Sequence, residues 1–157
     1  MNFKTLYNAG AVRRYHTQNL LKDQDLAAHS WGVALIIREI MPGNLHLVEA
    51  ALTHDLAESI TGDIPYTGKK KYPKLKQTSL EAEREFAMVN GTPLQLTPVE
   101  QKCLAWADMF ECYLYSMREV DMGNNLMRYV VETAREALVV MGPPTKEADK
   151  LFRSYNG

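Results

Sequence analysis

Signals that start and stop helices recur along this chain, and they restrict its possible folds more than any other feature of the sequence. Residues 97–100 (TPVE) combine a Thr-x-x-Glu capping box with a proline at the first helical position, which marks a strong helix start. The Pro-Gly pair at 42–43 and the Gly-Pro-Pro run at 142–144 are typical helix ends. No segment shows the sustained alternation of apolar and polar residues that indicates a half-buried strand. The sequence therefore predicts an all-α protein.

The predicted helices form one domain. A chain of 157 residues is long enough to bury a hydrophobic core without stabilising disulfides or structural metals, and no repeat or linker divides it. We therefore expect residues 1–157 to form a single compact bundle of six or seven helices. Residues 62–77 contain two prolines, two glycines and five lysines, a composition that predicts an exposed loop. The helices are expected at residues 2–8, 29–40, 46–61, 78–90, 98–120, 126–141 and 145–155.

The charge and composition of the chain limit where the protein is expected to work in the cell and which classes of partner it is expected to bind. The formal net charge is −1, whereas proteins that bind polymeric nucleic acid are normally basic. The sequence has no apolar stretch of membrane-spanning length and no signal-peptide pattern at its start. Cys103 and Cys112 lie roughly 13 Å apart along one predicted helix, so they cannot form a disulfide within it. We expect a cytoplasmic protein with reduced cysteines that binds neither membranes nor polymeric nucleic acid.

A His-Asp doublet, His54 and Asp55, is the most informative chemical feature. Glu58 follows one helical turn later on the same face as His54, and Asp63 lies just past Gly62. A lone His-Asp pair is most often a solvated pair on a surface helix. Here the pair lies in an otherwise apolar helix, where an unpaired buried carboxylate is costly. A metal ion removes that cost, and imidazole with carboxylate suits Mn, Co, Fe, Ni, Zn or, with more oxygens, Mg.

Two further residues strengthen the metal interpretation. His29 begins one predicted helix, and Asp108 lies in the middle of another, between Trp106 and Phe110. A carboxylate in such an apolar segment needs a partner. The order of His29, the doublet and Asp108, each in a predicted helix, is far more specific than the doublet alone.

Four short motifs carry a resemblance to a known superfamily. Together with the order of the histidines and aspartates, they resemble the HD-domain metal-dependent phosphohydrolases, which are named after their His-Asp doublet. Within that superfamily the chain is similar to the bacterial 5'-deoxynucleotidase branch and to short phage dNTP triphosphohydrolases, including those that act on dATP. The resemblance covers residues 14 to about 115. The motifs are residues 14–15 (RY), 28–30 (AHS), 54–58 (HDLAE) and 61–65 (TGDIP).

The resemblance implies a fold, a ligand set and roles for individual residues. It implies an HD-domain helical bundle that binds a divalent ion (Mn, Co, Zn or Mg), forms a homo-oligomer and works in the cytoplasm of a bacterium or a phage-infected cell. Relatives usually have glutamate before the first histidine, where this chain has Ala28. Because that glutamate contacts a ligand rather than the metal, its absence affects the orientation of His29 and not the ligand set. The implied metal ligands are His29, His54, Asp55 and Asp108; Glu58 would position or activate the attacking water, Asp63 would assist or hold a second metal, and Arg14 would grip a phosphate.

Further candidates for substrate binding lie near these motifs. His16, two residues after Arg14, is as readily a phosphate or sugar contact as an ordinary loop histidine. A run of lysines after Asp63 is more often a solvated surface, but it also suits a cradle for a polyanionic substrate, with Lys69 and Lys70 closest to the motif. This run favours a triphosphate over a monophosphate, because a triphosphate carries more negative charge.

The expected function is metal-dependent hydrolysis of deoxynucleotides. The preferred activity is that of a dNTP triphosphohydrolase of the dATP type, which releases the deoxynucleoside and triphosphate. A 5'-deoxynucleotidase that acts on dNMPs is the alternative within the same class. A metal-holding sensor or interaction module without catalysis is the alternative of another class. Hydrolysis of cyclic nucleotides or (p)ppGpp uses the same ligand set, but those relatives normally have additional helices.

Overall fold

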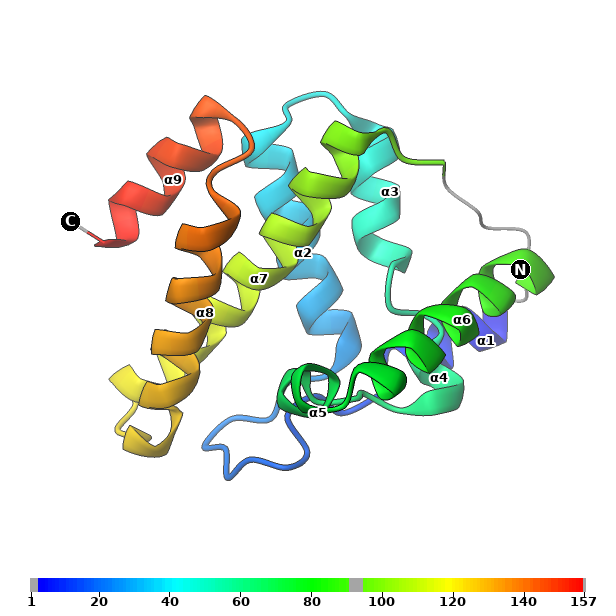
Figure 1. Cartoon of the computed structure of the whole chain (residues 1–157), viewed down its shortest axis with the longest axis horizontal. Helices are drawn as coiled ribbons and strands as arrows, with labels where there is room; N and C mark the ends of the chain where they lie inside the picture. Colours follow the sequence, from blue (N-terminus) through cyan, green and yellow to red (C-terminus); the bar gives the residue numbers. More distant parts are fainter. Residues whose placement is uncertain (1–2, 91–94, 157) are drawn as a thin grey trace.

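The computed structural model describes residues 3–90 and 95–156, and within these ranges the regular secondary-structure elements are helices, as predicted (Figure 1). Among the described residues, no helix is both long enough and apolar enough to cross a membrane. The shorter helices are α1 (Phe3–Ala9), α4 (Glu58–Thr61), α5 (Tyr66–Lys71) and a 3₁₀ turn, η1 (Asn125–Met127). The longer helices are α2 (Leu26–Ile40), α3 (Leu45–Thr53), α6 (Pro73–Asn90), α7 (Pro98–Asp121), α8 (Arg128–Met141) and α9 (Lys146–Asn156).

Helix α7 lies at the centre of the bundle, and it begins as the sequence predicts. The backbone N–H of Glu100 donates to the Thr97 hydroxyl, while the Glu100 carboxylate accepts from the Thr97 N–H. These two reciprocal hydrogen bonds satisfy N–H groups that have no partner inside the helix. Pro98 follows at the first helical position, where its missing N–H costs nothing.

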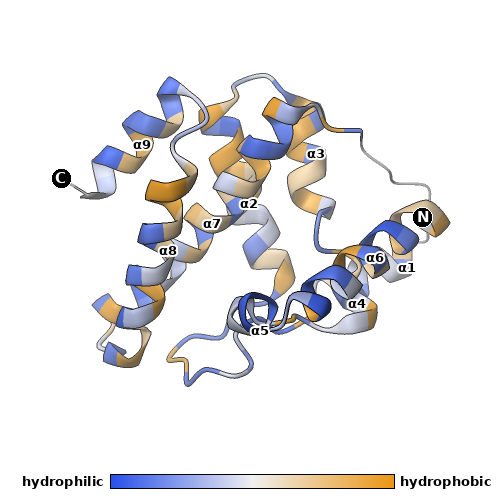
Figure 2. Cartoon of the chain, viewed as in Figure 1, coloured by the Kyte–Doolittle hydropathy of each residue, from blue (hydrophilic) through white to orange (hydrophobic). Residues whose placement is uncertain are grey.

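The main core joins α2, α3, α7, α8 and α9. Helix α2 packs against α3, α7 and α9, and α7 also packs against α8. Trp106 and Phe110 of α7 stack with ring centroids 4.8 Å apart, and Phe152 of α9 meets both rings edge-on. Burial of each such side chain contributes about 1.5–3 kcal/mol to folding. Figure 2 shows apolar residues along α2 and α3, whereas α5 and much of α6 are hydrophilic.

A second, smaller core lies at the other end of the molecule, where α1 contacts α4 (Figure 1). Ala9, Leu26 and Leu56 form it, and Val12 and Phe86 pack against them. Leu56 directly follows the His-Asp doublet in the sequence. The doublet is therefore held between the main core on one side and this smaller cluster on the other.

The segment at 62–77 is largely exposed, as predicted, but it is not a loop, because α5 and the start of α6 occupy most of it. Pro65 is the N-cap residue of α5, and Pro73 is the first residue of α6. Proline is well tolerated at a helix start, so these prolines begin helices that their composition alone does not reveal. The predicted start at residue 78 therefore lies inside α6. The predicted start at residue 2 lies outside the described residues, and so does Gly91, which follows the predicted helix end at residue 90.

The helix predicted at 46–61 is interrupted at the doublet. Helix α3 ends at Thr53 and α4 begins at Glu58. Between them the N–H of Leu56 donates to the carbonyl of Thr53, and the N–H of Glu58 donates to that of Asp55. These i→i+3 bonds are tighter than those of an α-helix and rotate successive side chains by a larger angle. His54 and Asp55 thus lie in a turn rather than on a helix flank.

The loop between α1 and α2 is tied to α7 by a buried carboxylate. Glu119 is fully buried and accepts hydrogen bonds from the N–H groups of Leu21 and Lys22 and from the side-chain amide of Asn124. The Tyr115 hydroxyl, one turn earlier, donates to the carbonyl of Lys22. Burial raises the pKa of Glu119, but the three hydrogen bonds outweigh it and keep that pKa below its usual value. The anchor fixes the loop that carries Arg14.

Replacement of Glu119 by glutamine tests this anchor. Both carboxylate oxygens accept from N–H donors, so the amide NH₂ of glutamine must face a donor in either orientation. We expect Glu119→Gln to lower the free energy of unfolding by about 2 kcal/mol, the usual cost of a buried polar group without its partner. Urea denaturation followed by circular dichroism measures this change. Asp121→Asn, at an exposed position of the same helix, is the matched control and should change stability by less than about 0.5 kcal/mol.

Candidate metal centre

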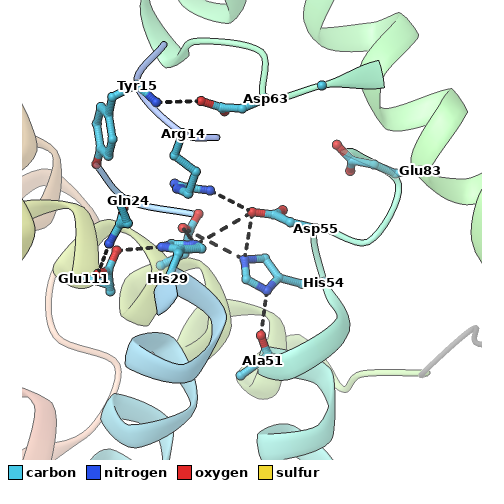
Figure 3. Close-up of polar contacts among 12 residues, drawn as sticks. Arg14, Tyr15, Gln24, His29, Ala51, His54, Asp55, Asp63, Glu83 and Glu111 are labelled. Atoms are coloured by element: carbon cyan, nitrogen blue, oxygen red, sulfur yellow. Dashed lines mark hydrogen bonds and ion pairs between the residues drawn. The ribbon is translucent and has the colours of Figure 1, made fainter. Parts of the chain in front are cut away.

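The four predicted metal ligands come together between α2, α3 and α7. His29 lies in the first turn of α2, His54 and Asp55 follow the end of α3, and Asp108 lies in the middle of α7. One potential ligand atom from each residue lies within 4.8 Å of those of the other three. Figure 3 shows the side chains of His29, His54 and Asp55 pointing toward one another. The fold therefore brings three separate segments of the chain to one point.

Hydrogen bonds determine which nitrogen each imidazole presents. Nδ1 of His29 lies 2.6 Å from Oε2 of Glu111, and Nδ1 of His54 lies 2.8 Å from the carbonyl oxygen of Ala51. Because both partners are acceptors, each Nδ1 carries a proton, and a neutral imidazole then keeps a free lone pair on Nε2. Both Nε2 atoms are buried and make no hydrogen bond. Histidines that coordinate metals are typically held in this way.

The two carboxylates face these nitrogens. Oδ2 of Asp55 lies 3.2 Å from Nε2 of His54 and 3.7 Å from Nε2 of His29. Oδ1 of Asp108 lies 3.2 Å from Nε2 of His29. Two neutral imidazoles and two carboxylates balance the charge of a divalent cation, and nitrogen with oxygen suits Zn, Mn or Co. These residues fit a divalent metal ion.

Electrostatic effects on the doublet support this fit. Burial lowers the pKa of His54, but the charges of Asp55 and Asp108 outweigh it and raise that pKa to about 9. Burial raises the pKa of Asp55, yet His54 and Arg14 outweigh it and hold that pKa well below its usual range. The carboxylates therefore attract positive charge to this point. A metal ion supplies that charge in place of a proton, since histidine must be neutral to bind a metal.

Arg14 approaches the ligands from the loop before α2. Its Nη1 lies 3.1 Å from Oδ2 of Asp55, and its buried Nε makes no hydrogen bond. The next residue, Tyr15, has a φ of +53°, a left-handed conformation that is unfavourable for a bulky residue. The N–H of Tyr15 donates to Oδ2 of Asp63 at 3.1 Å (Figure 3), and its ring stacks on Tyr115 with centroids 5.0 Å apart. Asp63 therefore holds the backbone that aims Arg14.

Glu58 is a buried carboxylate beside the ligands. It is 7% exposed, and its Oε2 has no hydrogen-bond partner. Burial raises its pKa to about 8, with a further contribution from the charge of Asp55. A carboxyl group with a pKa near neutrality, held beside a cluster of ligands, is a candidate general acid or base.

A pocket of about 190 Å³ opens over this centre. Asp55, Glu58 and Asp108 line it, together with four residues of α8: Tyr129, Val130, Thr133 and Ala134. The side chain of Asp108 is 42% exposed, which is more than its apolar neighbours in the sequence suggest. Arg14 and Lys69 are the arginine and lysine residues among those that line the pocket. A small molecule bound in the pocket can thus contact predicted metal-binding side chains, a candidate base and two cationic groups.

Of the remaining predicted substrate contacts, some line the pocket and others do not. Lys69 lines the pocket, whereas Lys70 and the later lysines do not. His16 is exposed and is not among the lining residues, although its neighbours Thr17 and Gln18 are. Only part of the lysine run therefore faces the site.

Two residues at the site were not predicted from the sequence. Glu111 and Gln24 are buried beside His29, and Nε2 of Gln24 donates to Oε1 of Glu111 at 2.7 Å. One sequence feature could have identified Glu111: it lies three residues after Asp108, one turn along the same helix, and therefore near the same face. The sequence offers no comparable signal for Gln24, which reaches the site from an irregular loop.

Comparisons with known proteins agree with this geometry. The profile of the family described as "5'-deoxynucleotidase YfbR-like" matches residues 2–154. A search of curated proteins finds no match. Among solved structures, the chain is similar to the HD phosphohydrolase DatZ of cyanophage S-2L, bound to dA and one catalytic Zn²⁺ ion, with 22% identity, a TM-score of 0.73 and coverage of 99% of this chain and 96% of that one. It is also similar to an HD-domain phosphohydrolase from Listeria innocua, with 21% identity, a TM-score of 0.75 and coverage of 96% and 84%.

The structural similarities lie below 25% identity and establish the shared HD-domain fold, while the family profile spans nearly the whole chain. The cluster of His29, His54, Asp55 and Asp108 has the ligand types that a metal-dependent phosphohydrolase requires. The chain therefore belongs to the 5'-deoxynucleotidase YfbR-like family and is a metal-dependent phosphohydrolase of the HD-domain type.

Proposed function

We propose that this protein hydrolyses the 5'-phosphoester bond of deoxynucleoside 5'-monophosphates, releasing the deoxynucleoside and inorganic phosphate. The observation that carries the proposal is the pocket in which Arg14 and Lys69 lie over the cluster of predicted metal ligands. A terminal phosphate between these groups meets positive charge on both sides. The family description points to the same substrate class.

The number of cationic groups favours the monophosphate. The sequence-based preference for a triphosphate depends on five lysines, and four of them do not line the pocket. Arg14 and Lys69, together with a divalent ion, suffice for one phosphate group. A dNTP triphosphohydrolase remains the second candidate, because Lys70 and Lys71 share the last turn of α5 with Lys69 and raise the positive potential near the pocket. Cytoplasmic location and homo-oligomerisation stay predictions.

The residues of this chain have distinct roles in the proposed reaction. A divalent ion held by His29, His54, Asp55 and Asp108 would polarise the phosphoryl group and lower the pKa of water. Arg14 holds the phosphate through donors that Asp55 does not occupy and neutralises charge that develops on the phosphoryl oxygens. Glu58 accepts the proton of the attacking water, whose oxygen forms the new bond to phosphorus. The bond between phosphorus and the 5' oxygen breaks, and the released oxygen takes up a proton to become the 5' hydroxyl.

Loss of a predicted ligand should remove the metal and the activity together. We expect His54→Ala and Asp55→Ala to contain no stoichiometric metal and to lose essentially all nucleotidase activity. Elemental analysis of the purified proteins measures the metal directly. His46→Ala, which removes an exposed histidine elsewhere, is the control and should keep both properties. Full metal content in both doublet variants would contradict the assignment of this site.

Replacement of Glu58 by glutamine should separate chemistry from metal binding. The amide side chain in Glu58→Gln keeps the size of the carboxylate but cannot take a proton, so kcat should fall by about 10²–10⁴-fold while the metal is retained. Single-turnover hydrolysis of a dNMP, together with elemental analysis, measures both effects. Asp63→Asn is the comparison, because the structure places Asp63 on the Tyr15 backbone. If Glu58→Gln turns over like the wild type and Asp63→Asn does not, Asp63 becomes the candidate base.

The lysines discriminate between the two candidate substrates. For a monophosphatase, Lys69→Ala should raise KM for dNMP about tenfold, since a hydrogen bond to a charged group contributes roughly 1.5–3 kcal/mol. Joint replacement of Lys70, Lys71, Lys74 and Lys76 by alanine is the matched control, and it should leave KM within about twofold at physiological salt, where exposed charges are screened beyond about 8 Å. Steady-state assays with all four dNMPs and dNTPs measure these values.

The same assays also identify the other candidates. A larger kcat/KM for dNTPs than for dNMPs, with a higher dNTP KM in the fourfold lysine variant, would establish the triphosphohydrolase. Absence of turnover for every deoxynucleotide with Mn, Co, Mg and Zn, despite bound metal, would favour a metal-holding module without catalysis.

A further inference from the structure

The buried carboxylate of Glu111 lies on the side of the His29 ring that faces away from the other predicted ligands. It is 8% exposed, and its Oε2 lies 2.6 Å from Nδ1 of His29. His29 itself is fully buried, so water does not compete for this hydrogen bond. A charged acceptor makes a shorter and stronger hydrogen bond than a neutral one. The contact fixes both the rotation of the ring and the nitrogen that carries the proton.

Gly32, on the same face of α2 one turn after His29, provides the space for this carboxylate. A Cβ atom at position 32 would lie 2.9 Å from Cγ of Glu111 and 3.3 Å from its Oε1. The first distance is shorter than atoms tolerate, so any larger residue would push the Glu111 side chain away from its present position. Glycine is otherwise disfavoured inside a helix relative to alanine. Its presence here is explained by the close approach of Glu111.

Gln24 holds the second oxygen of the same carboxylate. Its Nε2 donates to Oε1 of Glu111 at 2.7 Å, and its backbone carbonyl accepts from the N–H of Arg14 at 2.9 Å. Hydrogen bonds therefore connect the Arg14 backbone to Gln24, Gln24 to Glu111 and Glu111 to His29, and Figure 3 shows the last two. Gln24 therefore contacts both the backbone of Arg14, the candidate for phosphate binding, and Glu111, which contacts the predicted metal ligand His29.

We infer that Glu111 is a positioning residue that aims Nε2 of His29 at the metal, and that Gly32 exists to admit it. The inference rests on the proposed metal centre and adds a residue to it. Both oxygens of Glu111 are engaged away from the cluster, by His29 and Gln24, so it acts through the histidine and not as a ligand.

Binding of Co²⁺ to the metal-free full-length protein tests the inference without reference to turnover. In Glu111→Gln the neutral side chain cannot accept from both His29 and Gln24, so Co²⁺ affinity should fall about 10–100-fold, as is usual when a residue that orients a ligand is lost. The visible d–d spectrum of bound Co²⁺ should change as well. Affinity is measured by absorbance titration in competition with a chelator, and folding is checked by thermal melting.

Leu138→Ala is the control for general loss of stability, because Leu138 is buried in the main core on α8 and is not among the residues that line the pocket. It should lower the melting temperature yet leave Co²⁺ affinity and spectrum unchanged. Wild-type affinity in Glu111→Gln, or an equal loss of affinity in Leu138→Ala, overturns the inference. If the wild-type protein and His54→Ala bind Co²⁺ equally weakly, the metal centre itself is wrong and the inference fails with it.

A double-mutant cycle tests the role of Gly32 and remains informative if glutamine at position 111 impairs folding. Gly32→Ala alone should lower Co²⁺ affinity, since the added Cβ displaces Glu111. In the background of Glu111→Ala, whose side chain lacks the displaced atoms, Gly32→Ala should cause no further loss. Full additivity of the two losses would show that Gly32 acts independently of Glu111 and would overturn the proposed relation between them.

Discussion

Asp55 and Asp108 bring two negative charges to one point between three helices, and the surrounding structure is arranged to offset them. His29 and His54 present Nε2 toward these carboxylates because their Nδ1 atoms are held by Glu111 and by a backbone carbonyl. Without such partners, two partly buried carboxylates so close together would destabilise the fold by repulsion and desolvation. The charge requirement explains why the site suits a divalent cation.

The loop before α2 shows how local strain is tolerated at this site. Tyr15 adopts a left-handed backbone conformation, which costs about 1–2 kcal/mol for a residue with a side chain. The hydrogen bond from its N–H to Asp63 and the stack of its ring on Tyr115 offset that cost. Further along the loop, Glu119 holds residues 21–22 against α7. The conformation of this loop directs Arg14 toward Asp55, one of the predicted metal ligands.

Local signals in the sequence predict those helices that begin with a capping motif and those metal ligands that belong to a recognisable sequence motif. The capping box at 97–100 is confirmed, and the histidines and aspartates that resemble the HD pattern do come together. The region at 62–77 is mispredicted because prolines there start helices, a distinction that depends on position rather than composition. The contribution of Glu111 could not be predicted, because it depends on which face of α7 meets α2. The same limit applies to His16, whose exposure follows from the path of an irregular loop.

The pairing of Arg14 with Asp55 has a consequence for substrate binding. A guanidinium group has five N–H donors, and the contact at 3.1 Å to Asp55 involves one nitrogen, Nη1. In the proposed reaction, Arg14 therefore donates to the phosphate without giving up the carboxylate that keeps it in place. Its side chain is largely removed from water before substrate arrives, so binding does not require further desolvation or ordering of a long flexible group. A preorganised donor of this kind stabilises charge that develops during phosphoryl transfer more effectively than a mobile surface lysine does.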